Sequence, residues 1–136
     1  MKTEETRALI ERYLAARAAN DAAALDALLT DDAEWHLPRS ADAGPFIGRE
    51  KVLEALTGGV SGKLFDLSTM KREAWNVIVD GDTAAVQQKL TATTLKGAEY
   101  VNEYCWVYTC RDGKVQLLEE YADTLYAGRV FGWIKD

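Results

Sequence analysis

This chain of 136 residues is poor in histidine, cysteine and clustered basic charge, and each shortage excludes a class of function. His36 is the only histidine and there are two cysteines, too few for a metal site that needs about three or four converging ligands. Its 16 basic side chains are outnumbered by 22 acidic ones and form no cluster larger than Lys71-Arg72. Because nucleic acids and anionic membranes are bound through basic surfaces, we expect neither as a partner, and we expect no metal ion.

Long apolar runs and nucleotide-binding motifs are absent as well. The first residues are charged and no uninterrupted apolar stretch follows, which predicts neither a signal peptide nor a transmembrane helix. None of the glycine patterns of dinucleotide sites, phosphate-binding loops or nucleophile elbows occurs, so we expect no cofactor. Cys105 and Cys110 lie five positions apart in one expected strand, hence on opposite faces, which predicts two reduced thiols in a cytoplasmic protein.

The remaining composition is that of an ordinary globular domain, and residues 1–136 are expected to form one domain. Apolar residues at spacings of three and four predict a helix over residues 3–20 and a short second helix over residues 22–29. A short strand over residues 34–37 and a turn-rich loop over residues 39–48 should follow. A third helix is expected from residue 49 to about residue 56.

The second half of the chain reads as four long strands, over residues 64–79, 83–95, 99–110 and 115–123. The segments between them contain Asp-Gly or Lys-Gly, which are hairpin signals, so the strands should be antiparallel in sequence order. Strands of this length generally twist and bulge. The sequence therefore predicts an α+β fold in which three helices cover a strongly curved, mainly antiparallel sheet. The space between them should be a cone with an open mouth, a common place for a ligand.

Three segments carry a resemblance to a known family: RYLAARAANDAAALDALLTDDAEWHLP, WHLPRSADAGPFIGREKV and NEYCWVYTCRDGKVQLLEEYADT. In this order and spacing the chain resembles the nuclear transport factor 2-like superfamily, in particular its SnoaL-like and ketosteroid isomerase-related branches. The resemblance extends from Thr3 to about Val130. It implies the cone-shaped, cystatin-like fold and a homodimer formed through the outer face of the sheet.

The resemblance and the alternation of the strands single out candidate acid–base groups. Tyr13 sits where ketosteroid isomerases place the tyrosine that donates to the developing oxyanion; alternatively it is a core residue. His36 would exchange protons near neutral pH if it faced the cone; otherwise it is a rim or core histidine. Glu120 matches the aspartate that limonene epoxide hydrolase-like proteins hold deep in the pocket. Asp123 takes its place if a bulge shifts the register, unless these carboxylates are solvated or cap the C-terminal segment.

The chain departs from these relatives at positions that carry their chemistry. The general-base aspartate of the isomerase branch falls at about Leu37, so that reaction is not carried over. Gln87 and Lys89 stand where the epoxide hydrolase branch has an Arg-x-Asp pair, which excludes the hydrolase mechanism. Lys89 is expected either to form an ion pair with Glu120, lowering its pKa, or to point to solvent.

Alternation places an aromatic row interrupted by one amide on a single strand face: Tyr100, Asn102, Tyr104, Trp106 and Tyr108. Asn102 would orient an oxygen of the ligand, and Trp35, Gln87, Lys89 and Tyr104 are further candidates for binding it. A surplus of apolar residues at Trp35, Phe46, Trp75 and residues 131–134 is typical of a partner surface.

We therefore expect a cofactor-independent enzyme of the SnoaL-like type, an isomerase, cyclase or dehydratase, that acts on a small apolar compound bearing a carbonyl group. His36 and Glu120 or Asp123 would carry the proton, and Tyr13 and Asn102 would orient the compound. The alternative is a non-catalytic module with the same fold that binds a small ligand or assembles as a dimer.

Overall fold

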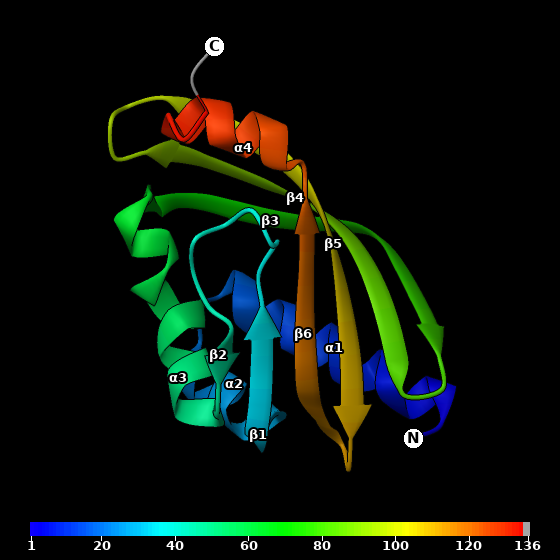
Figure 1. The fold of residues 1–136 in the computed structure, drawn as a ribbon. Helices are drawn as coiled ribbons and strands as arrows, with labels where there is room; N and C mark the ends of the chain where they lie inside the picture. Colours follow the sequence, from blue (N-terminus) through cyan, green and yellow to red (C-terminus); the bar gives the residue numbers. More distant parts are fainter. Residues whose placement is uncertain (135–136) are drawn as a thin grey trace.

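The computed structural model of this chain describes residues 1–134 and shows helices packed against a curved sheet (Figure 1). In chain order the elements are α1 (Thr3–Ala18), α2 (Ala22–Leu28), β1 (Leu29–His36), β2 (Phe46–Ile47), α3 (Arg49–Glu54), η1 (Ala55–Gly59), η2 (Ser61–Lys63), β3 (Phe65–Asp80), β4 (Thr83–Thr94), β5 (Glu99–Arg111), β6 (Lys114–Ala122) and α4 (Thr124–Phe131). This arrangement confirms the predicted α+β class, with a fourth helix that was not predicted.

The six strands form one mixed sheet in the order β2-β1-β6-β5-β4-β3. Strands β3 to β6 are antiparallel to their neighbours in sequence order, as the hairpin signals predict. Two of the turns between them contain Gly81 and Gly113 with positive φ angles, a conformation that favours glycine. Strand β6 is the last strand of this antiparallel series, and β1 pairs with it in parallel.

Irregular pairing along β3 accompanies the strong curvature of the sheet. The register between β3 and β4 shifts once between Asp66 and Lys71 and again between Ala74 and Asn76. Such bulges bend a strand and increase its twist. In Figure 1, β3, β4 and β5 sweep across the upper part of the molecule while α1 crosses behind the lower part. A cavity lies between the helices and this curved part of the sheet.

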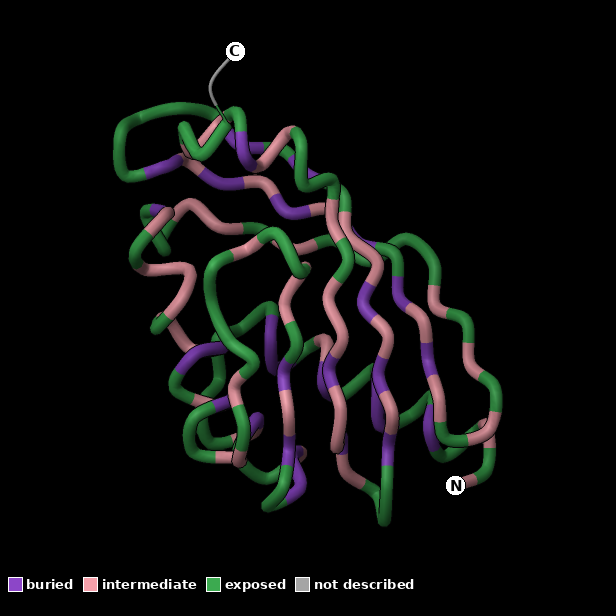
Figure 2. Tube along the Cα trace, viewed as in Figure 1, coloured by how far each residue is buried: buried purple, intermediate pink, exposed green. Residues whose placement is uncertain are grey.

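Two clusters of buried side chains lie on either side of this cavity. The larger cluster packs the α1 residues Leu9, Ile10 and Tyr13, none more than 1% exposed, against the lower half of the sheet. The smaller cluster packs Phe65 and Tyr100 of the sheet against α4. Figure 2 shows the buried and less buried residues alternating along the central strands, as expected of a sheet with one face on the core.

The start of β1 and the presence of α4 differ from the prediction because tertiary contacts decide them, and the predicted loop over residues 39–48 contains the short strand β2 paired with β1. Strand β1 begins at Leu29, five residues earlier than expected, because Leu29 is fully buried and pairs with Val115 of β6. The C-terminal segment forms α4 because the Asp123 carboxylate accepts a hydrogen bond from Tyr126 N and caps the helix.

Two expectations from the sequence concern the described residues: no transmembrane helix and no metal ion. No helix within residues 1–134 is long and apolar enough to cross a membrane. Within the same residues, no group of three or more His, Cys, Asp or Glu side chains is placed to hold a metal ion. Cys105 and Cys110 are both free thiols, and burial raises the pKa of Cys110 to about 11.

Candidate functional site

A cavity of about 880 Å³ opens between the concave face of the sheet, α1, the α3 region and α4. Apolar and aromatic side chains form most of its wall, among them Trp35, Leu37, Phe65, Leu90, Trp106 and Phe131. Within residues 1–134, only a few polar side chains reach it from the interior: Arg17, Arg72, Gln88, Tyr100, Tyr104 and Glu120. An apolar wall with a few convergent polar groups is typical of a small-molecule site.

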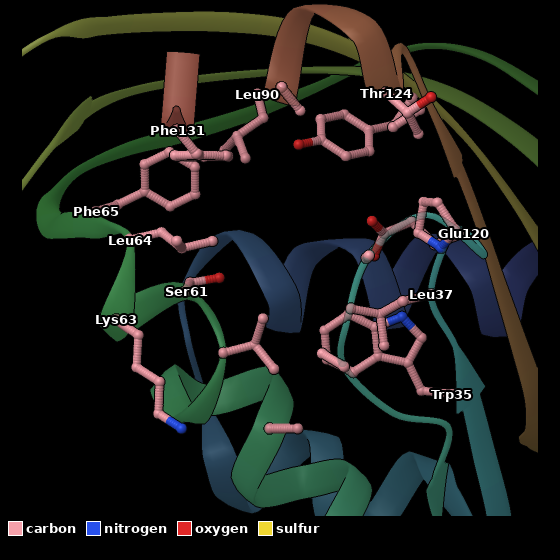
Figure 3. Close-up of a pocket in the computed structure, with 18 of the residues that line it drawn as sticks. Trp35, Leu37, Ser61, Lys63, Leu64, Phe65, Leu90, Glu120, Thr124 and Phe131 are labelled. Atoms are coloured by element: carbon pink, nitrogen blue, oxygen red, sulfur yellow. The ribbon is translucent and has the colours of Figure 1, made fainter. Parts of the chain in front are cut away.

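Glu120 supplies the carboxyl group of this cavity. It shares its face of β6 with Leu118, which is fully buried, and Figure 3 shows its carboxyl group directed into the cavity beside Trp35 and Leu37. Burial raises the pKa of Glu120 to about 7, with the Trp35 indole and the cations Arg17 and Arg72 partly offsetting the effect. A carboxyl group with this pKa accepts and donates protons readily near neutral pH.

Trp35 stands next to Glu120 in the wall. Its side chain is 4% exposed, and its ring lies 5.4 Å from that of Phe46 and 5.6 Å from that of Trp106, centroid to centroid. The indole Nε1 is buried and has no hydrogen-bond partner of normal geometry within residues 1–134. This N–H is therefore available to a carboxylate or to a ligand oxygen.

Two arginines that were not predicted as site residues bring positive charge to the cavity. Arg17 of α1 donates from Nη1 to the carbonyl oxygen of Leu56 at 2.9 Å, and its guanidinium carbon lies 5.9 Å from the centroid of the Trp106 ring. Arg72 of β3 is partly buried, and burial, together with the nearby charge of Arg17, lowers its pKa to about 10. Arg17 follows Tyr13 by four positions on the apolar stripe of α1, a signal that was available in the sequence.

Tyr13 lies in the core and does not line the cavity. Its ring packs edge-on against Tyr108 at 5.2 Å, and its side chain is completely buried. The hydroxyl group has no hydrogen-bond partner of normal geometry within residues 1–134, and burial raises the pKa of Tyr13 to about 12. The described geometry thus fits the core alternative better than contact with a ligand oxyanion.

Asn102 also acts one step behind the cavity wall. Its Nδ2 donates to Tyr100 Oη at 2.8 Å and to the carbonyl oxygen of Asp123 at 3.1 Å, while its Oδ1 accepts from Glu103 N. Tyr100 Oη lies 2.7 Å from Oη of Tyr104, which lines the cavity. Asn102 therefore orients a chain of hydroxyl groups that ends at Tyr104, rather than facing a ligand itself.

The predicted pairing of His36 with Glu120 does not occur. His36 Nε2 lies 3.0 Å from Glu34 Oε1 on the outer face of β1, because alternation along this strand sends Trp35 to the cavity and its neighbours outward. Asp123 is not in the cavity either, since it caps α4.

Gln87 and Lys89 point to the outer face of β4, because the concave side of this strand carries the buried Gln88 and Leu90. Lys89 nevertheless borders the cavity, whereas Gln87 does not. Gln87 Oε1 accepts from Asn76 Nδ2 at 2.9 Å. Lys89 Nζ lies 3.8 Å from Glu73 Oε2, so the predicted ion pair with Glu120 is replaced by a surface pair.

The expected surplus of exposed apolar residues divides between the wall and the surface. Trp35 and Phe46 belong to the cavity wall, and Phe131 packs at 5.2 Å against the Tyr100 ring. Trp75 and Trp133 are 54% and 56% exposed. Of the apolar residues predicted to form a partner surface, only the exposed ones are therefore available to a partner.

Comparison with known proteins identifies the family. The family model of the SnoaL-like domain matches residues 10–117, and the match ends just before Glu120. No curated protein sequence matches this chain.

Solved structures share the fold over most of the chain. Bal32a, from a soil-derived mobile gene cassette, is 28% identical, with a TM-score of 0.81 over 95% of this chain and 97% of that one. An NTF2-like protein of unknown function from Burkholderia pseudomallei is 19% identical, with a TM-score of 0.81 over 92% and 95% of the two chains. An LEH-like epoxide hydrolase from M. tuberculosis is 19% identical, with a TM-score of 0.74 over 96% and 93%. The last two likenesses establish the fold alone.

Proposed function

Since this chain belongs to the family of SnoaL-like domains, we propose that it is a cofactor-independent enzyme that moves a proton on a small carbonyl-bearing compound, in an isomerisation, cyclisation or dehydration. Glu120 is the proton carrier, and the cavity beside it holds the compound. One observation carries this proposal: within residues 1–134, Glu120 is the carboxyl group that projects into the interior of a cavity with aromatic walls, and burial raises its pKa to about 7.

The reaction begins with Glu120 as a carboxylate that takes a proton from a carbon next to the carbonyl group. The electrons of that C–H bond move to the carbonyl oxygen, and the positive charges of Arg17 and Arg72 favour the resulting enolate. Protonated Glu120 then returns the proton, to a different carbon in an isomerisation or to a leaving hydroxyl group in a dehydration. The carboxyl group ends in its starting state, so no other reactant is consumed.

A non-catalytic binding or assembly module remains the second candidate. The departures from the relatives at Leu37, Gln87 and Lys89 favour it, as does the outward position of His36. Large apolar side chains on the outer face, Ile78, Val101 and Tyr121, are 57%, 40% and 56% exposed and support a homodimer through this face.

Proton exchange at carbon separates the two candidates. The test compound is β-tetralone in deuterated water, and NMR follows the loss of its protons next to the carbonyl group. We expect the protein to accelerate this exchange, and Glu120→Gln to lower the rate by about 10²- to 10⁴-fold. Glu119→Gln is the matched control, because Glu119 lies on the opposite face of β6.

An unchanged exchange rate in Glu120→Gln would reject Glu120 as the proton carrier. If the wild-type protein itself caused no exchange in any of a panel of cyclic ketones, the binding-module candidate would replace the enzyme.

A further inference from the structure

Arg72 differs from the other interior cation of the cavity in having no fixed partner. Arg17 is held by the Leu56 carbonyl oxygen and the Trp106 ring. The guanidinium group of Arg72 has neither a hydrogen bond nor an ion pair with any of residues 1–134, although its side chain is partly buried and lines the cavity. A guanidinium group presents up to five donors in a planar fork that matches an anionic oxygen pair. In this protein that fork is left for water or a ligand.

The charges of the cavity interior do not balance. Within residues 1–134, Arg17 and Arg72 face it with only one interior carboxyl group, Glu120, which is not within ion-pair distance of either. Four of the other charged lining residues within residues 1–134 are exposed at the rim and cancel: Asp42 and Glu54 against Lys51 and Lys63. The fifth, Lys89, lies beside Glu73 outside the cavity. The interior therefore carries an excess of positive charge whether or not Glu120 is ionised.

A flat ligand that filled this space would displace the water around Arg72. A guanidinium group stripped of water is strongly unfavourable unless the ligand replaces the lost hydrogen bonds. A neutral carbonyl oxygen replaces part of them, whereas a carboxylate or enolate also supplies the opposite charge and short charge-assisted hydrogen bonds. The interior charge thus favours a ligand that is itself an anion.

Tyr104 adds a neutral donor close to the same place. Its hydroxyl group ends the chain that starts at Asn102 and passes through Tyr100. When Tyr100 donates its proton to Tyr104, the proton of Tyr104 is left to be donated into the cavity. Arg72 and Tyr104 both line the cavity, so a ligand that fills it meets both donors.

We infer that the ligand of this cavity is a flat carbonyl compound carrying an ionised oxygen, a carboxylate or an enolate, and that Arg72, assisted by Tyr104, binds this oxygen. The inference rests on the proposed function only in taking the cavity as the ligand site. It narrows the substrate from an apolar compound to an acidic one, and it assigns Arg72 the selection of charge.

A matched pair of probes tests charge selection without knowledge of the natural substrate. Naphthoate and naphthamide have nearly the same shape and differ by one negative charge. We expect isothermal titration calorimetry near pH 6 to give naphthoate at least about a tenfold lower Kd than naphthamide, the size expected for a hydrogen bond to a charged group. Arg72→Gln should remove this preference, and Arg72→Lys should restore part of it. Lys71→Gln, which removes the exposed neighbouring cation, should leave it unchanged.

Equal affinity of the wild-type protein for the two probes, or binding of neither, would overturn the inference without any variant. Retention of the full preference by correctly folded Arg72→Gln, checked by its thermal unfolding, would also overturn it. Binding needs no turnover, so loss of the charge preference and loss of proton exchange on Glu120→Gln are separate results. Each proposal can therefore be rejected while the other stands.

Discussion

The two faces of the sheet carry the same kinds of charged side chain in opposite circumstances. On the outer face, His36 lies beside Glu34 and Lys89 beside Glu73, with these side chains exposed to solvent. Such surface pairs contribute little to the free energy of unfolding, because water already solvates both partners.

On the concave face, Glu120 is surrounded by aromatic walls and has no ion pair within residues 1–134. There the loss of water raises its pKa to about 7, and the nearby cations offset this only in part. In this chain the residue type is therefore a poor guide to the chemistry of a side chain, whereas the face of the strand on which it lies is a good one.

Truncating the concave face should cost far more stability than truncating the outer one. Leu118 is fully buried on β6, so Leu118→Ala is expected to lower the free energy of unfolding by about 2–5 kcal/mol through lost burial and an unfilled cavity. Leu117→Ala, one position away on the outer face, should cost less than half as much. Urea unfolding of both variants measures the difference, and similar losses would contradict this assignment of the faces.

The pH dependence of stability should have a sign set by Glu120. Its pKa is about 7 in the folded protein and 4.5 as the ordinary value, so the unfolded chain releases this proton first. The favourable contribution is full below about pH 4.5 and is lost as the pH rises to about 7, a change of up to about 3 kcal/mol. The groups that interact electrostatically with Glu120 are Trp35, Arg17, Arg72, Tyr100, Tyr104 and Tyr108. Glu120→Gln should flatten the profile between these pH values in denaturant titrations, whereas Glu119→Gln should not.

The exposed carboxylate of Asp32 should make stability depend on pH with the opposite sign. Two hydrogen bonds from Arg111 hold Asp32, at the surface, and they lower its pKa to about 2. Its contribution is present above about pH 3.8 and is lost as the pH falls towards 2. Asp32→Asn should therefore reduce the pH dependence only in the acid range, and a change near neutral pH would argue against this assignment.

The hydroxyl chain behind the cavity should make a smaller contribution. Tyr100→Phe leaves Asn102 Nδ2 with one partner fewer and removes the neighbour of Tyr104 Oη. We expect a loss of about 1–2 kcal/mol in the free energy of unfolding, because buried polar groups are left unpaired. Tyr126→Phe, which removes a hydroxyl group that accepts from the exposed Val101 N, is the control and should cost less.

The smallest effect should come from the outer face. Lys89→Gln removes one partner of a 3.8 Å pair whose side chains are 42% and 66% exposed. Its free energy of unfolding should change by less than about 1 kcal/mol, and high salt should abolish the change. A loss comparable with that of Leu118→Ala would mean that Lys89 is not at the surface.

Local sequence rules were sufficient for most of the sheet and for one site residue. Glycine-containing turns set the hairpins, and alternation from Leu118 placed Glu120 on the concave face. The same alternation along β4 places Val86, Gln88 and Leu90 on the concave face. The resemblance to the epoxide hydrolase branch instead predicted site residues at Gln87 and Lys89, which lie between them. In this strand the apolar pattern was the better guide.

The remaining differences depend on contacts between distant segments. Whether Arg72 faces inward follows from the register shift between Asp66 and Lys71, which has no local signal in the sequence. His36 faces outward because the parallel pairing of β1 with β6 fixes which side chains turn towards the core. The cap at Asp123 was foreseen as an alternative, but the helix that it begins is stabilised by packing on Phe65 and Tyr100.

The aromatic wall also gives the protein an optical property. Trp35 and Trp106 are buried against each other beside Glu120, while Trp75 is exposed on β3. Fluorescence from the buried pair should lie at shorter wavelengths, and a ligand that stacks on these indoles should quench it. Trp133 is exposed too but lines the cavity, whereas Trp75 does not. Trp75 would therefore continue to emit as an internal reference, so the natural compound can be sought in metabolite fractions by emission colour alone, with no label attached.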